Sequence, residues 1–155
     1  MWIDQRGSEV LTEAECHQLL AIAAKEDAIG RLAVSGTGAP IVVPVNFAVQ
    51  DHQILIRVGA GTLADLAIGR LVAFEIDERD RAASSAWSVL VRGLASMVET
   101  TTVKDPSQLP HPLVHTPGDT VLAVRPDVVS GRRFSLQAEN TITATEYPPA
   151  PRPPQ

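Results

Sequence analysis

The sequence is poor in cysteine and in long apolar runs, and each shortage excludes a class of protein. The single cysteine, Cys16, can form neither an internal disulfide nor a cysteine-built zinc site. No apolar stretch approaches the ~18 residues that a membrane-spanning helix needs, so we expect no membrane partner. The N-terminal residues MWIDQRGSEVLTE include acids and no apolar run, unlike a secretory signal. We therefore expect a cytoplasmic protein.

Basic charge and aromatic residues are scarce as well. Lysine and arginine number 13 against 18 acidic residues, which gives a formal net charge of −5. Nucleic-acid binders usually present a basic surface, so we expect no nucleic-acid partner. A small anionic ligand needs only one local positive site and stays open. Because aromatic residues make up only 4% of the chain, we expect a core of Val, Leu, Ile and Ala.

Apolar residues make up 45% of the 155 residues, which fits one globular domain. We place a single domain at residues 1–146 and a Pro-rich tail at 147–155, because the last eight residues, PPAPRPPQ, contain five prolines. Such a tail is expected to be extended and poorly packed. An aromatic groove of a partner could bind it.

Helical and strand patterns divide the chain clearly. Thr12 followed by Glu15 is a capping-box pair, and an apolar stripe after it predicts a helix over about 12–25. Alternating apolar residues then predict strands at 29–35, 41–49, 53–59, 71–78, 86–100 and 120–126, and a final strand or strand plus turn at 127–136. A short helix is expected from near Gly61 to near Gly69. Pro44 indicates a sheet edge or a bulge, and Gly93 a bend or a bulge. The pattern favours a small closed or nearly closed antiparallel barrel.

The segment ILIRVGAGTLA, residues 54–64, is the most informative chemically. A strand delivers Arg57, and Gly61 and Thr62 follow at a helix start. Glycines allow backbone to approach a phosphate closely, and an arginine can add a bidentate fork. The alternative is an ordinary glycine turn with a helix cap and a surface arginine.

Other candidate sites are weaker. His111 and His115 are four residues apart, but nearby prolines favour a loop over a metal site, and His17 and His52 are interpreted as isolated surface residues. Glu75 and Asp77 share one strand face. They could form an acid/base pair, although cross-strand ion pairs with arginines are the plainer interpretation. Cys16 is expected to be a structural thiol.

Taken in order, several segments resemble the pyridoxamine 5′-phosphate oxidase-like family, the flavin-binding split barrels. They are LTEAECHQLLAIA, GRLAVSGTGAPIVVPVNFAV, ILIRVGAGTLADLA, VAFEIDE, WSVLVRG and VRPDVVSGRRF, which together span about residues 11–134. The branch common in actinobacteria is the most similar. The resemblance implies a mainly β (α+β) fold, a six-stranded antiparallel split β-barrel with short flanking helices. It also implies a homodimer with two sites between the subunits.

The resemblance also implies a set of cofactor-binding residues. The family's phosphate pattern, an arginine followed by G-[ST]-K, matches Arg57, Gly61 and Thr62, whereas Leu63 stands at the lysine position. The positions that face a flavin ring in the family are Pro44, Val45 and Asn46, and those of the W-S segment that approaches the ligand are Trp87 and Ser88. No catalytic side chain and no metal are expected.

Three functions follow from these residues. The first is an oxidoreductase that passes hydride through bound FMN to a small-molecule substrate. The second is a reductase that uses the deazaflavin coenzyme F-420. The third, which Leu63 favours, is a non-catalytic binding or sequestering protein with an eroded flavin site. For the homodimer, we expect Val89, Val91 and their neighbours to lie in the interface.

Overall fold

A computed structural model describes residues 2–3, 8–59, 61–99, 103, 105, 107, 109–111 and 120–135. The predicted Pro-rich tail, His115 and most of the connection at 100–119 lie outside these residues. Two helices are present, α1 (Glu13–Lys25) and α2 (Thr62–Ala67). The strands are β1 (Trp2–Ile3), β2 (Glu9–Leu11), β3 (Ile29–Val34), β4 (Ile41–Gln50), β5 (Gln53–Val58), β6 (Leu71–Asp80), β7 (Ser85–Val98), β8 (Thr120–Val124) and β9 (Val128–Ser135).

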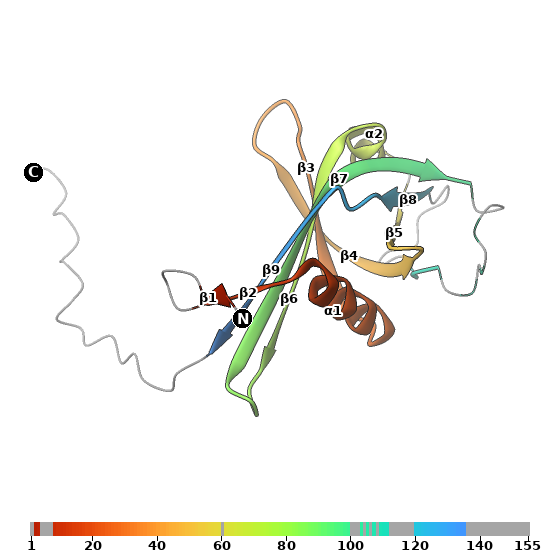
Figure 1. The fold of residues 1–155 in the computed structure, drawn as a ribbon. Helices are drawn as coiled ribbons and strands as arrows, with labels where there is room; N and C mark the ends of the chain where they lie inside the picture. The colour runs from red at the N-terminus through yellow and green to blue at the C-terminus, as the bar shows by residue number, and fades with distance from the viewer. Residues whose placement is uncertain are drawn as a thin grey trace, which may run out of the picture.

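Six antiparallel strands close into a barrel. The order of the sheet is β1-β2-β9-β7-β6-β3-β4-β5-β8, and an additional pairing of β7 with β8 closes the ring from β3 to β8. Strands β9, β2 and β1 follow one another outward from β7 and extend the sheet beyond the ring (Figure 1). The predicted fold, a mainly β six-stranded antiparallel split barrel, is confirmed. The two N-terminal strands were not predicted.

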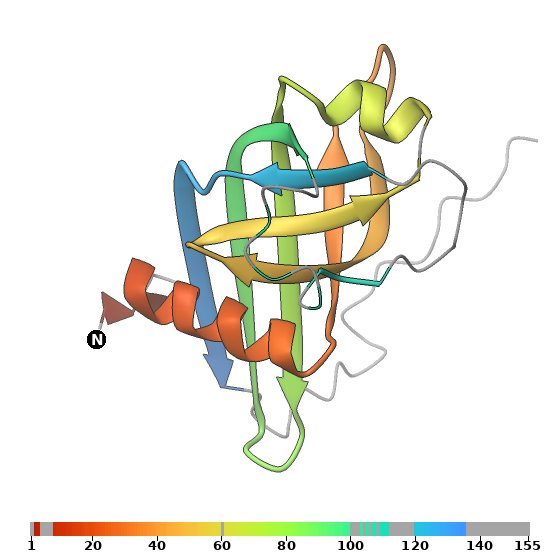
Figure 2. The same cartoon turned by 90° about the vertical axis from the view of Figure 1, so that its right-hand side faces the viewer.

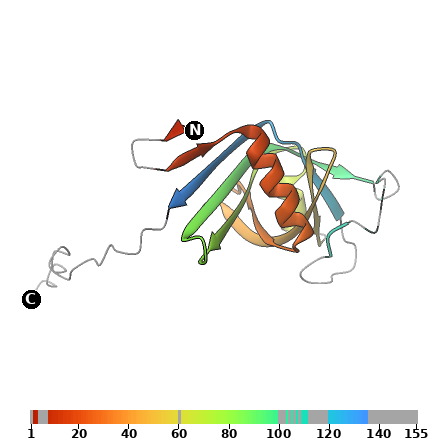
Figure 3. The same ribbon diagram turned by 60° about the horizontal axis from the view of Figure 1, so that its bottom comes forward.

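The first helix begins where the capping box places it. The Thr12 side chain accepts a hydrogen bond from the Glu15 amide at 3.3 Å, and the Thr12 amide donates to the Glu15 carboxylate at 2.7 Å. The apolar face of α1 buries Cys16, Leu20 and Ala23 in the main core. Figures 1 and 2 show α1 and α2 at opposite ends of the barrel, and Figure 3 shows α1 crossing in front of it. The two helices therefore cover opposite ends of the core.

Strand β7 changes partner at Gly93. It pairs with β9 from Ser85 to Arg92 and with β8 from Ala95 to Val98. A Cβ atom on Gly93 would overlap the carbonyl of Arg125, which lies in the link between β8 and β9. The close backbone approach therefore requires glycine, at the position where the sequence predicts a bend or bulge.

Pro44 lies at a local edge, as predicted. It pairs with Arg31 of β3, and the pairing of β4 with β5 begins only at Phe47. The missing amide of Pro44 therefore interrupts no ladder on the β5 side.

The core is built mainly from branched aliphatic residues, in keeping with the low aromatic content. Phe74, Leu32, Ile54, Ile76 and Leu122 are among its largest fully buried side chains.

Val89 and Val91 are fully buried on the inner face of β7. The prediction that they lie in a dimer interface is therefore wrong. The alternation of the strand turns Leu90 and Arg92 outward instead.

Candidate functional site

Arg57 lies at the end of β5 with part of its guanidinium buried. It pairs in register with Val121 of β8, and its Nε atom is buried without a hydrogen-bond partner among the described residues. An unpaired buried donor on a cationic group is costly, so an anion that accepts from it would be stabilised. The structure thus places one unsatisfied positive group at the end of this strand.

Asn46 lies beside Arg57. The pairing of β4 with β5 starts at Phe47 and Ile56, so Asn46 and Arg57 are the next residues at that end of the two strands. Side chains alternate along a strand, so Asn46 lies on the same face as Ala48, and Arg57 on the same face as Leu55. Ala48 and Leu55 pack in a second, smaller hydrophobic cluster, separate from the main core. Asn46 and Arg57 therefore share the outer face of the barrel.

The side-chain amide of Asn46 is held in place by the long connection. Its Nδ2 atom donates a hydrogen bond to the backbone oxygen of His111 at 2.9 Å. The two residues are 65 positions apart in the chain, so no local sequence signal predicts this contact. Next to Asn46, Val45 is 5% exposed in the main core and Pro44 is exposed. Of these three residues, Asn46 is therefore the one whose side chain is available on the outer face near Arg57.

Gly61, Thr62 and Leu63 form the turn into α2, shortly after Arg57. Gly61 has φ of 139°, a conformation that glycine adopts readily, and it is the N-cap of α2. Thr62 is exposed, whereas Leu63 is half-buried and packs on the main core. Asp65 stands in the first turn of this six-residue helix. Arg57 is therefore the only basic residue between positions 57 and 65, and one acid lies close to it in sequence.

Trp87 and Ser88 lie far from Arg57 within one chain. Arg57 is in register with Val121, which pairs with Val98 of β7. Trp87 lies eleven positions before Val98, which is about 36 Å along the strand at ~3.3 Å per residue. Figure 2 likewise places the turn between β6 and β7 at the end of the molecule opposite to α2. By register the structure places Asn46 next to Arg57, and the α2 turn follows Arg57 in the chain, whereas Trp87 and Ser88 lie toward the other end of β7.

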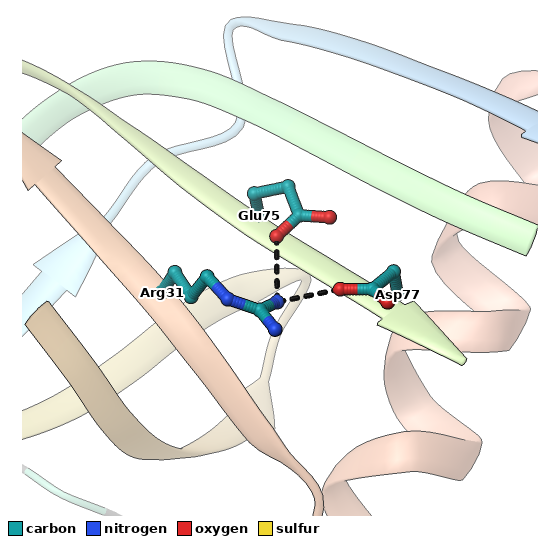
Figure 4. A network of polar contacts seen from close by, with 3 residues as sticks. All are labelled: Arg31, Glu75 and Asp77. Atoms are coloured by element: carbon teal, nitrogen blue, oxygen red, sulfur yellow. Dashed lines mark hydrogen bonds and ion pairs between the residues drawn. The ribbon is translucent and has the colours of Figure 1, made fainter. Parts of the chain in front are cut away.

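The two carboxylates of β6 are engaged in ion pairs (Figure 4). Arg31 Nη1 lies 2.9 Å from Glu75 Oε2 and 2.5 Å from Asp77 Oδ1. The hydrogen bonds that Arg31 donates to Asp77 and then to Glu75 raise its pKa further above the ordinary value. The three side chains are between one third and one half exposed. The interpretation as cross-strand ion pairs is confirmed.

His17 and His52 are not isolated. Their rings meet edge to face with centroids 5.3 Å apart, which joins α1 to the turn between β4 and β5. Cys16 is fully buried beneath Gly131, and burial, with Glu15 and Glu13 nearby, raises the pKa of its thiol. Within the described residues, no three His, Cys, Asp or Glu side chains are arranged to hold a metal ion. Neither described helix is long and apolar enough to cross a membrane.

Comparison with known proteins gives consistent matches over most of the chain. The uncharacterised protein Rv0080 of Mycobacterium tuberculosis is 34% identical over 117 residues, which cover 68% of this chain and 74% of that protein. The FAD binding protein from Mycobacterium smegmatis is 30% identical with a TM-score of 0.66, covering 81% of this chain and 99% of its own. An FAD-binding protein from Mesorhizobium loti, 20% identical with a TM-score of 0.61, covers 83% and 99% and shows the shared fold.

The family match has the same extent as the barrel. The family described as pyridoxamine 5′-phosphate oxidase matches residues 12–133, from the cap of α1 into β9. Its span includes the ring of six strands, the Arg57 turn and the partner switch at Gly93. The chain belongs to the pyridoxamine 5′-phosphate oxidase family.

Proposed function

We propose that the protein binds a flavin nucleotide at the Arg57 end of β5 and transfers hydride between that flavin and a small molecule. The observation that carries the proposal is the buried Nε of Arg57, which lacks a partner and lies beside Asn46. A flavin phosphate is an acceptor of the required charge. The related Mycobacterium smegmatis protein is an FAD binding protein, which supports the same class of ligand.

The residues at this end fit a phosphate, with one cation fewer than the family pattern. Arg57 would hold the phosphate, and Gly61 leaves room for close approach of the main chain, since no atom lies within 4 Å of a Cβ built there. Leu63 packs on the core and supplies no charge. Asn46 would orient the ring system from the outer face of β4. A bound flavin supplies the two-electron chemistry, and the chain's role is to bind and orient it.

FMN is the first candidate among the flavins, because the family's phosphate pattern matches at Arg57, Gly61 and Thr62. FAD is the second, because the similar Mycobacterium smegmatis protein is an FAD binding protein. The deazaflavin coenzyme F-420 carries the same type of anchor and belongs in the same titration.

We further propose a cytoplasmic homodimer. One chain separates Trp87 and Ser88 from Arg57 by most of the length of β7, so a site that contains all three needs a second copy. Light scattering at micromolar concentration is expected to give twice the 16.5 kDa chain mass. A monomer would refute the shared site and leave only the Arg57 and Asn46 half.

The flavin proposal is tested by titration of the purified protein with FMN, FAD, coenzyme F-420 and riboflavin. In Arg57→Ala, binding of FMN is expected to weaken about tenfold to hundredfold, because a hydrogen bond to a charged group contributes ~1.5–3 kcal/mol. Riboflavin lacks the phosphate and is expected to bind both proteins equally. Arg79→Ala, which removes an exposed arginine near the turn between β6 and β7, is the matched control. Equal loss of FMN and riboflavin in Arg57→Ala would show that the arginine supports the fold and not the phosphate.

The competing function is non-catalytic binding, and the packing of Leu63 favours it. Leu63, at the family's lysine position, packs on the core. The phosphate site therefore has one cation fewer than the family pattern, and no other basic residue between 58 and 65 replaces it. A protein that is purified colourless and binds none of the flavins in the titration would establish this alternative over the oxidoreductase.

A further inference from the structure

A second candidate site lies between the end of α1, strand β4 and residues 107 and 109–111. It is a groove of about 720 Å³, which we call the α1–β4 groove. Its volume falls within the ~300–1,000 Å³ typical of small-molecule sites. Asn46 borders it, but neither Arg57 nor the turn at 61–63 does. The groove therefore meets the proposed flavin site at Asn46 and includes none of the phosphate-binding residues.

Small residues on one side of α1 create the space. Ala21, Ala24 and Lys25 line the groove and fall at helical spacing on one face, and Ala28 continues that line after the helix. The neighbouring Leu20 and Ala23 are buried in the main core, and Ala24 and Ala28 are partly buried against it. A leucine or methionine at position 21 or 24 would fill the groove, so alanine at these positions is what keeps it open.

The floor of the groove contains a free strand edge. β3 pairs with β4 only as far as Ile29 and Asn46, whereas residues Phe47–Gln50 pair with β5 alone. In an antiparallel pair, alternate residues turn their N–H and C=O groups away from the partner strand. In the described part of the chain, no backbone hydrogen bond outside the strands reaches these residues. The edge therefore offers donors and acceptors to a ligand that lies in the groove.

The walls combine apolar surface with one cation that has no partner. Leu109 and Pro110, both buried, form the wall opposite the alanines. Lys25 is exposed at the mouth, and it makes no ion pair with any described residue. Asp27 also lines the groove, and its carboxylate opposes the attraction of Lys25 for an anion, twice as strongly for a doubly charged ligand as for a singly charged one.

We propose that the α1–β4 groove binds a small, flat, apolar monocarboxylate. The carboxylate pairs with Lys25, the apolar body lies between the α1 alanines and Leu109, and the edge of β4 hydrogen-bonds the ligand's polar rim. The proposal uses none of the phosphate-binding residues, and Asn46 is the residue that the groove shares with the proposed flavin site.

The test uses 2-naphthoate as the probe and the neutral 2-naphthamide as its uncharged counterpart, titrated into the ¹⁵N-labelled full chain. A probe of this size is expected to bind with Kd of about 1 mM or tighter. Amide shifts are expected at Ala24, Lys25 and Asn46. In Lys25→Gln, naphthoate is expected to bind roughly two- to fivefold more weakly, as for an exposed ion pair, and naphthamide is expected to bind unchanged.

Variants with a larger side chain that fills the groove locate the site. Ala24→Leu is expected to weaken both probes by more than tenfold, whereas Ala14→Leu, at an exposed position on the same helix, is expected to bind them like the parent chain. If Ala24→Leu fails to fold, Ala21→Leu fills the same groove, and Lys25→Gln tests the charge in either case. Shifts that map elsewhere, or tight binding by both plugged variants, would overturn the proposal. Flavin absorbance recorded on the same samples separates this outcome from failure of the flavin site.

Discussion

Substitution of Gly93, which is buried within β7, by alanine is expected to destabilise the barrel far more than the same change at the open position Gly38. A Cβ there would overlap the Arg125 carbonyl oxygen, and it would lie 2.8 Å from the carbonyl carbon and 3.2 Å from the Asp127 amide nitrogen. Non-bonded heavy atoms prefer ~3.5–4.0 Å, and the carbonyl oxygen is the nearest of the three atoms, so the link between β8 and β9 has to retreat by roughly 1.5–2 Å. All three obstructing atoms are backbone, which cannot rotate out of the way as a side chain can.

The magnitude follows from what that link holds. Overpacking in a well-packed region costs about 1–3 kcal/mol. The retreat also strains two backbone hydrogen bonds to β7, from Arg125 to Leu94 at 3.0 Å and from Asp127 to Arg92 at 3.1 Å, each contributing about 1 kcal/mol net. We expect a total loss of about 3–5 kcal/mol, a large part of the ~5–15 kcal/mol by which domains are stable.

Urea unfolding of the two glycine variants measures this difference. Gly38→Ala is the matched control, because no atom lies within 4 Å of a Cβ at that position, and its stability is expected within about 0.5 kcal/mol of the parent chain. The free energies are compared at equal m-values, so that a change in the denatured state is not mistaken for a change in the barrel. A Gly93→Ala protein that loses less than about 1 kcal/mol would refute the argument from close backbone approach.

Two further predictions concern Leu63 and Glu15. Leu63→Lys is expected to strengthen FMN binding because it supplies a cation, and the gain in affinity is expected to shrink as the salt concentration rises. The same change is expected to lower the free energy of unfolding by roughly 1–2 kcal/mol, because a half-buried leucine is lost. The control Leu63→Met is expected to keep the stability without the gain in affinity. A Leu63→Lys protein that folds normally but binds FMN no more tightly would contradict the one-cation explanation. Hydrogen bonds from the Thr12 amide and then its hydroxyl lower the pKa of Glu15 below its ordinary 4.5, so its contribution to stability is present above pH 4.5 and is lost as pH falls through the lowered value. Glu15→Gln is therefore expected to show a flatter fall of Tm below pH 4.5, with Glu26→Gln at the other end of α1 as the control, and an unchanged slope would show that the capping box contributes nothing to acid sensitivity.

The parts of the fold that were predictable are those with local causes. The capping pair Thr12 and Glu15 identifies the start of α1, because both partners lie within one helical turn. Alternation of apolar residues identifies the ring strands, and Pro44 and Gly93 mark positions where backbone geometry restricts the residue type. These signals need no knowledge of distant contacts.

The parts that were missed depend on distant contacts. Strands β1 and β2 contain two and three residues, too few for an alternating pattern, and β2 exists because β9 pairs with it. Alternation separates the two faces of β7 but does not indicate which face is enclosed by the barrel. The sequence therefore could not show that Val89 and Val91 lie in the core and not in an interface. The groove was missed because alanines in a helix look ordinary, and only the position of β4 shows that they leave a space.

The candidate site also has one part that could be predicted from local sequence and another that depends on distant contacts. The Arg57 segment could be recognised from one continuous motif, whereas the contact of Asn46 with His111 and the separation of Trp87 from Arg57 follow from the closure of the sheet. A motif with consecutive residues thus predicts the phosphate end, and a site assembled from several strands requires the structure.

The pairing of β2 with β9 has a consequence for synthesis of the chain on the ribosome. Glu9 and Arg133 are partners 124 positions apart. Strand β2 therefore cannot pair with β9 until almost the whole domain has emerged from the ribosome. The ring itself cannot close before β8 arrives to meet the second half of β7. Non-local closure of this kind is slow, because the loop entropy is lost before the contacts form. The nascent protein is therefore expected to carry an unpaired strand edge until translation is nearly complete, which is the period in which a chaperone would bind it.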